Sequence, residues 1–262
     1  MGRNGNSLYM YRRLIGGRAQ IVPCKTSFMT SGDIEEAVKL HRRVTSGLSP
    51  EIFAPTGERD IERLVGGDGV SFGVWFEKRL ICMRAVIVDG DWVNETLAHM
   101  GLGEDEQNRT VYTDHCIVDR EFRGNNVQFL THYAIEQKIA GRYDVFFTTV
   151  SPKNSFSLQN ILGCNFVIVG IKKLYGGYLR YVMRKKLSTG LPIWTHGHLV
   201  IPISDIARQQ EAIADGCVGY KMIRKHRGFS VLYAPMAERS PKGYWKNMAV
   251  GKNTARAQSS AA

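Results

Sequence analysis

The chain has 262 residues and a formal net charge of +11, and 44% of its residues are hydrophobic. This composition is typical of a soluble globular protein with one large domain, or one domain with an extension. It argues against a membrane partner, because no apolar run approaches the roughly 20 residues that cross a bilayer. The amino-terminal stretch lacks the apolar segment of a signal peptide. Five widely spaced cysteines without a CxxC pair predict a reducing, cytoplasmic compartment.

The positive charge is concentrated near the two ends of the chain. From Lys221 onward there are nine basic residues and one acidic residue, Glu238, which leaves a net +8 in this segment. A second basic cluster lies near the amino terminus and comprises Arg3, Arg12, Arg13 and Arg18. Such segments are solvated surface, or they bind an anionic ligand or nucleic acid.

The pattern along the chain predicts a mixed α/β fold. Runs rich in β-branched and aromatic residues alternate with stretches of helical periodicity. We expect strands at 19–24, 72–77, 80–88, 111–118, 145–150, 166–171 and 179–186. We expect helices at 32–45, 58–65 and 154–163, and one that begins near Val127 and stops at Gly141.

The carboxy-terminal part repeats the alternation once more. A strand at 199–203, a helix that Ser204 caps and that runs to 214, and strands at 218–224 and 229–234 form an appended β-α-β-β unit. This unit would cover the sheet edge, shape a substrate pocket or mediate formation of a homodimer, and the sequence does not separate these roles. The expected organisation is a basic segment at 1–18, a main domain at 19–187, the appended unit at 188–237 and a basic, disordered tail at 238–262.

The most informative stretch is 113–141, which reads as a strand, a tight basic turn and a helix. The turn contains Arg123 and Gly124, followed by Asn125 and Asn126, and Asn tolerates left-handed backbone better than most residues. Such a turn points free backbone N–H groups and the positive end of the helix dipole at one spot. That spot suits a phosphate group.

The order of elements from 19 to 186 resembles the GNAT superfamily of N-acetyltransferases, and the specific part of the resemblance is 111–166. The acyl-CoA loop of that family follows the pattern Arg/Gln-x-x-Gly-x-Gly/Ala. Arg123 takes the leading position, whereas Asn126 and Gln128 stand where the family has small residues. The resemblance implies a central, mixed, splayed β-sheet flanked by helices, here with the appended β-α-β-β unit.

The resemblance also implies direct transfer of an acyl group to an amine in a ternary complex, without a metal. The donor is acetyl-CoA or another acyl-CoA, and related lineages with a loose loop accept acyl carrier protein. The family's donor-binding positions fall on the strand end, on the turn and on the Asn-led helix. They are Cys116, Ile117, Val118, Arg123, Gly124, Asn125, Asn126, Val127, Asn154 and Ser157.

Acyl transfer to an amine also needs a base and an acid. Asp114 is the first choice for the base, at a position where several relatives carry one, and His115 is the alternative. Adjacent strand residues face opposite sides, so only one of them faces the donor unless a bulge intervenes. By the same alternation Cys116 lies opposite His115 and belongs to the core. The family's tyrosine acid would fall at Ile161, so a hydroxyl must come from Tyr175, Tyr178 or Tyr181.

A second class of function stays open from the sequence. The same scaffold without catalysis would bind nucleic acid or an acidic protein partner through its basic segments. The basic carboxy-terminal charge is explained equally well by docking of an acidic carrier protein. The amine acceptor is not identified by any motif.

Overall fold

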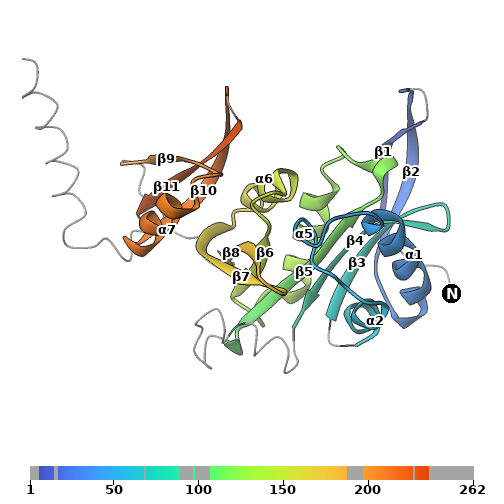
Figure 1. Cartoon of the computed structure of the whole chain (residues 1–262). Coiled ribbons are helices and arrows are strands. Elements are labelled where there is room, and N and C mark those ends of the chain that lie inside the picture. Colours follow the sequence, from blue (N-terminus) through green and yellow to red (C-terminus); the bar gives the residue numbers. More distant parts are fainter. Residues whose placement is uncertain are drawn as a thin grey trace, which may run out of the picture.

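The computed structural model describes residues 6–14, 17–67, 69–88, 97, 107–187, 197–226 and 228–235. Its strands form one sheet of eleven, in the order β1-β2-β3-β4-β5-β6-β8-β7-β10-β11-β9 (Figure 1). All neighbouring strands are antiparallel except β5 and β6, which are parallel. The predicted mixed sheet flanked by helices is confirmed, and most of its strand pairs are antiparallel. None of the described helices has the length and apolar character needed to cross a membrane.

The element bounds agree with most of the predicted ranges to within a few residues. The strands are β1 (Asn6–Arg13), β2 (Ala19–Phe28), β3 (Gly69–Phe76), β4 (Arg79–Ile87), β5 (Thr110–Val118), β6 (Val145–Val150), β7 (Val167–Leu174), β8 (Tyr178–Lys186), β9 (Leu199–Pro202), β10 (Cys217–Lys225) and β11 (Gly228–Pro235). The helices are α1 (Ile34–Thr45), α2 (Glu58–Gly66), α5 (Val127–Ile139), α6 (Ser155–Gly163) and α7 (Ile206–Ala214), with short 3₁₀ turns η1 (Ser31–Asp33) and η2 (Arg120–Phe122).

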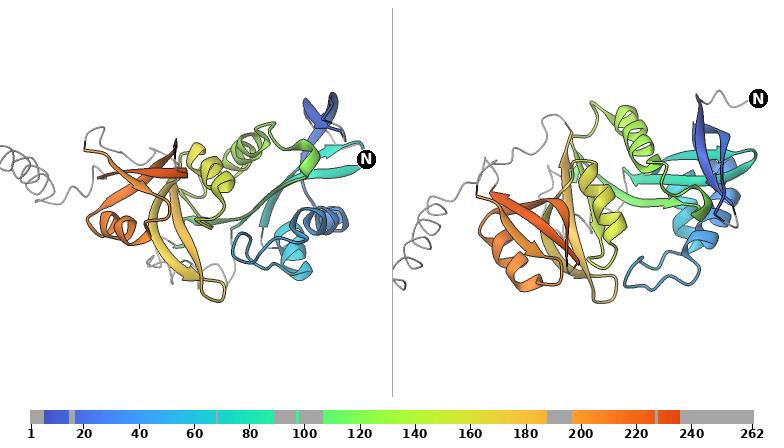
Figure 2. Two further views of the ribbon diagram at one scale, coloured as in Figure 1. Left: turned by 45° about the horizontal axis from the view of Figure 1, so that its top comes forward. Right: turned by 90° about the horizontal axis from the view of Figure 1, so that it is seen from above.

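The helices cover the two faces of the sheet (Figure 2). α1 and α2 pack on one face through a cluster that includes Leu40, Ile61 and Leu64. α5, α6 and α7 contribute to a larger cluster on β6, β7, β8, β10 and β11, with Phe146 and Phe166 among its fully buried members. The sheet therefore lies between two layers of helices.

The amino-terminal segment contains a strand that the sequence analysis missed. β1 pairs with β2 along its whole length, from Asn6 opposite Thr26 to Arg13 opposite Ala19. Met10 is buried, whereas Tyr9 and Tyr11 are exposed. The inward and outward residues in the middle of this strand, at 8–11, are all apolar or aromatic, so their alternation did not stand out. Residues 6–13 of the predicted basic segment thus form an edge strand of the sheet.

The appended unit continues the same sheet. β10 pairs with β7 at Gly219 opposite Ile168, so the unit covers what would otherwise be the edge of the main domain. Gln209 of α7 is fully buried and accepts hydrogen bonds from the hydroxyls of Tyr181 and Tyr233, each at 2.8 Å. Ser204 is not the cap of this helix, because Asp205 takes that position and accepts from the Arg208 N–H at 3.2 Å.

A buried polar cluster joins α5 to β8. His132 Nε2 lies 3.3 Å from the Glu136 carboxylate and 3.1 Å from Lys185 Nζ, and Lys185 also pairs with Glu136. Burial lowers the pKa of His132 to about 4, against the opposing effect of its hydrogen bond to Glu136. His132 is therefore neutral in the folded protein at neutral pH.

This cluster predicts acid sensitivity of the fold. The folded pKa of His132 lies below its ordinary value of 6.5, so the unfolded state binds more protons between about pH 6.5 and pH 4. Stability should fall as the pH falls through that window, by on the order of 3 kcal/mol from this group. Urea unfolding at several pH values should show a smaller loss in His132→Gln than in the wild type. Equal losses in both proteins would contradict the assignment.

Candidate functional site

The turn between β5 and α5 has the backbone that its sequence predicts. We call residues 119–126 the basic loop. Gly124 has φ +87° and Asn126 has φ +55°, so both adopt the left-handed conformation. No side chain caps the first turn of α5, which leaves its leading N–H groups at the loop. The predicted left-handed Asn126 is confirmed, and the arrangement is one that binds anions.

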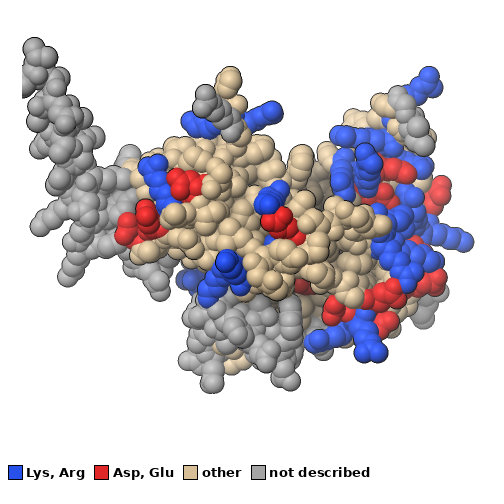
Figure 3. All heavy atoms as spheres, viewed as in Figure 1, with Lys and Arg blue, Asp and Glu red and all other residues tan. Residues whose placement is uncertain are grey.

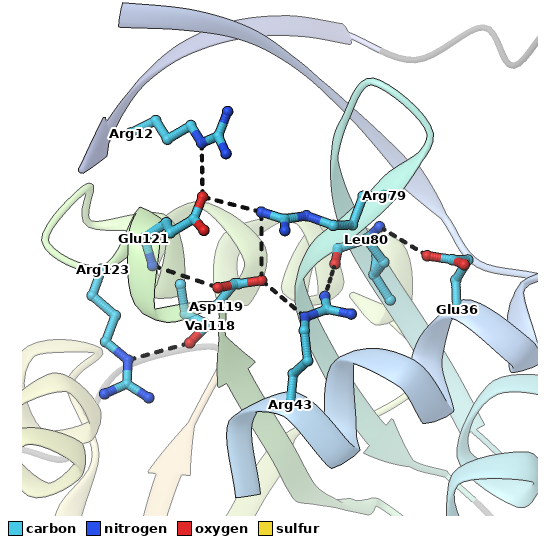
Figure 4. A network of polar contacts seen from close by, with 9 residues as sticks. All are labelled: Arg12, Glu36, Arg43, Arg79, Leu80, Val118, Asp119, Glu121 and Arg123. Atoms are coloured by element: carbon cyan, nitrogen blue, oxygen red, sulfur yellow. Dashed lines mark hydrogen bonds and ion pairs between the residues drawn. The ribbon is translucent and has the colours of Figure 1, made fainter. Parts of the chain in front are cut away.

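Ion pairs fasten one side of the basic loop to three other elements (Figure 4). Asp119 pairs with Arg43 of α1 at 3.2 Å and with Arg79, the first residue of β4, at 3.7 Å. Glu121 pairs with Arg12 of β1 at 2.7 Å and with Arg79 at 3.3 Å. The hydrogen bond from Arg12 lowers the pKa of the Glu121 carboxyl. The network holds the loop in register with α1, β1 and β4.

The side chain of Asn125 is used within the protein. Its Oδ1 accepts from the Tyr11 N–H at 2.7 Å, and its Nδ2 donates to the carbonyls of Tyr11 and Phe122, each at 2.8 Å. The side-chain amide thus forms the two hydrogen bonds that a neighbouring strand would form with Tyr11 at the outer edge of β1. Asn125 was predicted to bind a donor, but only its backbone is left for that purpose.

Arg123 points away from the ion-pair network (Figure 4). Its Nε donates to the Val118 carbonyl at 3.3 Å, which places the guanidinium beside the end of β5. The side chains of Ile117, Val118 and Val127 are buried in the core, so a ligand could meet these three predicted residues only through their backbone.

A groove opens between β5 and β6. The two strands pair at only three positions, from Thr110 opposite Val145 to Tyr112 opposite Phe147, and separate beyond them. A cavity of about 140 Å³ lies at the separation. The lining residues come from both strands, from α6 and the turn before it, from the loop before α2, and from β8 and the β7–β8 turn. They include Asp114, Cys116, Ser151, Asn154, Ser157, Ile161 and Tyr175.

Two predicted residues at the start of α6 lie together in this groove. The Oδ1 of Asn154 accepts from the Ser157 N–H at 3.0 Å, so Asn154 caps the helix. Both residues also line the groove. Ile161, one helical turn further, is apolar and lines it as well, at the position where the family's tyrosine was expected.

β5 carries a bulge at the predicted base. Ala85 of β4 lies opposite His115 and Val86 lies opposite Thr113, so Asp114 is the extra residue. The bulge brings the neighbouring side chains together, with 2.5 Å between His115 Nδ1 and Asp114 Oδ2. An ionised carboxylate only accepts hydrogen bonds, so we assign the proton to Nδ1.

Asp114 is more exposed than His115, although both residues line the groove. His115 is 3% exposed and packs against the rings of His41 and Phe53 at 5.5 and 5.4 Å. The Asp114 side chain is 21% exposed and lines the α2 side of the groove as well. Asp114 is therefore the more accessible of the two groups, and the hydrogen bond with His115 orients its carboxylate.

A second cavity lies on the other side of Asp114, beside α2. It has a volume of about 200 Å³, and we call it the α2 cavity. Its walls carry two carboxylates, a guanidinium and apolar side chains: Ala54, Pro55, Thr56, Asp60, Arg63, Leu64, Ile87, Asp114 and Tyr175. Asp114 and Tyr175 line both this cavity and the groove. The two cavities therefore meet at these side chains.

Tyr175 supplies the hydroxyl of the site. Its OH lies 2.6 Å from the Tyr112 OH and 2.9 Å from Thr149 Oγ1. Burial raises its pKa, so the phenol keeps its proton at neutral pH. Of the other candidates, Tyr181 donates to Gln209 in the core, and Tyr178 stacks near Arg180.

The sequence analysis missed Arg180, a buried residue of β8. Its guanidinium donates to the carbonyls of Pro50 at 2.8 Å and Glu51 at 2.9 Å, and it lies 5.5 Å from the Tyr175 ring. It therefore fastens the loop before α2, which forms a wall of both cavities. The only feature of the sequence that could have indicated this role is the presence of an arginine within a predicted strand.

Cys116 does not act with His115. Its side chain interacts with Thr131 of α5, whereas His115 packs against His41 of α1, so the two side chains lie on opposite faces as the alternation predicted. Cys116 also lines the groove. Burial raises the pKa of its thiol, so the thiolate needed for nucleophilic attack is disfavoured.

No protein-family model matches the chain, and no curated protein matches its sequence. Solved structures are similar to it over about two thirds of its length. A GNAT-family acetyltransferase from Streptococcus pneumoniae has 11% identity and a TM-score of 0.48, covering 63% of this chain and 99% of its own. An N-acetyltransferase from Staphylococcus aureus has 13% identity and a TM-score of 0.48, covering 63% and 97%.

A diaminobutyrate acetyltransferase from Paenibacillus lautus, solved with its substrate and coenzyme A, has 14% identity and a TM-score of 0.46, covering 62% of this chain and 93% of its own.

Proposed function

We propose that the protein is an N-acyltransferase that moves an acyl group from a CoA thioester directly to a small amine. The observation that carries this proposal is the placement of Asp114, which lines both the interstrand groove and the α2 cavity. A base in that position can take a proton from an acceptor in one cavity while the donor thioester lies in the other.

The donor is assigned to the groove and the basic loop. Its phosphates lie at the loop, beside Gly124 and the start of α5, and its pantetheine arm runs between β5 and β6 past Asn154 and Ser157. Beyond Tyr112, β5 has no strand partner on β6. The carbonyls of Thr113 and Val118 accept from Thr148 and Arg123, and we assign the other backbone groups along this edge to the arm. A backbone N–H of β5 near the bulge polarises the thioester carbonyl.

The acceptor is assigned to the α2 cavity. A volume of about 200 Å³ suits a small molecule. Asp60 and Asp114 favour a cationic amine, and Arg63 in the same wall suits an acceptor that also carries an anionic group.

The reaction follows from these positions. Asp114, oriented by His115, takes a proton from the acceptor ammonium, and the neutral amine attacks the thioester carbonyl. The C–N bond forms, the C–S bond breaks, and the leaving thiolate receives a proton from Tyr175. The second proton of the amine nitrogen, which is lost as the amide forms, restores the Tyr175 phenol directly or through water, and Asp114 releases its proton to solvent. The raised pKa of the Cys116 thiol favours this direct route over an acyl-cysteine intermediate.

Two measurements test the proposal. Calorimetric titration should detect binding of CoA, and mass spectrometry of thioesters that co-purify with the protein should report the donor and its chain length. Release of free CoA from that donor should then depend on an amine, in a panel of small amines and amino acids. A protein that binds neither CoA nor a carrier-protein thioester would overturn the proposal.

A further inference from the structure

The amino-terminal hairpin meets the basic loop directly. The two hydrogen bonds between the Asn125 side chain and the Tyr11 backbone, at 2.7 and 2.8 Å, fix β1 against the loop. The buried face of the hairpin adds Met10, which packs in one cluster with Phe122 and Val127. β1 therefore has a defined position relative to the loop and cannot slide along it without breaking both bonds.

Arg13 lies two residues after Tyr11 and on the same side of β1. Its Nη2 is 3.2 Å from the point that a Cβ atom on Gly124 would occupy. The guanidinium thus covers Gly124, the residue that starts the left-handed part of the loop.

The two arginines of β1 differ in their partners. Arg12 pairs with Glu121, whereas Arg13 forms no ion pair within the part of the chain that the structure describes. Lys and Arg side chains gather over β1, β2 and α1, and the central face over α5 and α6 is mostly uncharged (Figure 3). The positive charge of Arg13 is therefore not neutralised locally, and it faces the loop.

We propose that Arg13 is a donor-binding residue whose guanidinium contacts the phosphate at the 4′ end of the pantetheine arm. The inference rests on the function proposed above. It gives a role to one arginine of the amino-terminal basic cluster, and it adds a cation at a loop where Asn126 and Gln128 replace small residues. CoA and a phosphopantetheinylated carrier protein both carry this phosphate, so the contact serves either source.

The test compares Arg13→Ala with a matched control, Lys25→Ala. Lys25 is an exposed cation of β2 that pairs with Ser7, at the opposite end of the same hairpin from Arg13. Calorimetry would measure the affinities of CoA, 3′-dephospho-CoA, 4′-phosphopantetheine and pantetheine. Arg13→Ala should weaken the first three about tenfold, as expected for a lost charge-assisted hydrogen bond. It should leave pantetheine unchanged, and Lys25→Ala should change none of them.

The outcomes separate this inference from the proposed function. Equal losses for pantetheine, or a loss for CoA but not for its 3′-dephospho form, would overturn the assignment to the 4′ phosphate. Unchanged CoA binding in Arg13→Ala, with weaker binding in Arg123→Ala, would overturn the role of Arg13 and leave the function standing. No binding of any ligand to the wild type would overturn the function itself. Arg13→Gln serves as a second variant. Its near-UV circular dichroism, compared with that of the wild type, shows whether a loss of binding reflects misfolding.

A titration with carrier protein identifies the source of the phosphate. Holo carrier protein and its apo form, which lacks the phosphopantetheine arm, would be titrated into wild type and Arg13→Ala. A loss of about tenfold for the holo form alone supports the contact with a carrier-bound arm. Binding of CoA without binding of the holo protein assigns the contact to CoA.

Discussion

Asp114→Asn should lower kcat by about 10²- to 10⁴-fold and leave the affinity for CoA within a factor of two. An amide cannot take a proton from the acceptor ammonium, and general-base catalysis contributes about that factor. The substitution keeps the volume of the side chain and its ability to accept from His115 Nδ1. Steady-state rates at saturating donor and calorimetric CoA affinities would be measured on the same preparations.

Asp60→Asn is the matched control for this experiment. Asp60 lines the α2 cavity but not the groove, and its Oδ2 accepts from the Gly57 N–H at 2.8 Å, which an amide oxygen can also do. We expect this variant to change kcat by only a few-fold. Equal rates for Asp114→Asn and the wild type would eliminate Asp114 as the base and would direct attention to an external base or bound water.

Gly124→Val should abolish measurable CoA binding while the fold remains. Gly124 has φ +87°, a conformation that is strongly disfavoured for a β-branched residue. The added Cβ would also lie 3.2 Å from Arg13 Nη2. The loop would have to change its backbone, and the N–H groups that face the phosphates would turn away. Calorimetry with CoA, beside thermal unfolding, checks the result.

Gly141→Val is the control that shows whether backbone strain alone causes a loss of CoA binding. Gly141 has φ +83° and follows α5, with no atom within 4 Å of an added Cβ. Both substitutions should lower stability by on the order of 1–3 kcal/mol, but only the change in the basic loop should remove CoA binding. If the two variants lose CoA affinity alike, the loop geometry is not what binds the donor.

The strand, turn and helix around the basic loop were predictable because their signals are local. β6 has the bounds predicted from its run of six apolar and β-branched residues, Val145–Val150. The left-handed Asn126 follows from the tolerance of Asn for that backbone. Asn154 as a helix cap likewise needs only its own neighbourhood.

The parts of the site that were not predictable depend on partners far along the chain. The bulge at Asp114 is defined by the pairing with Ala85 and Val86, and nothing within 113–116 says which residue is extra. Arg180 binds carbonyls of Pro50 and Glu51, which lie 130 and 129 positions away. Every residue has the same backbone carbonyl group, so the sequence does not show which carbonyls Arg180 binds.

The continuous sheet restricts how two copies of this protein could associate. β7 has partners on both sides, so the outer strands are β1 and β9. On β1, the backbone N–H and C=O of Tyr11 already bind Asn125, and β9 has only four residues. Among the described residues, the outer edge of β1 is thus interrupted at Tyr11, and the outer edge of β9 is short. These two features disfavour extension of the sheet from one subunit into the next, and they favour side-chain surfaces for self-association.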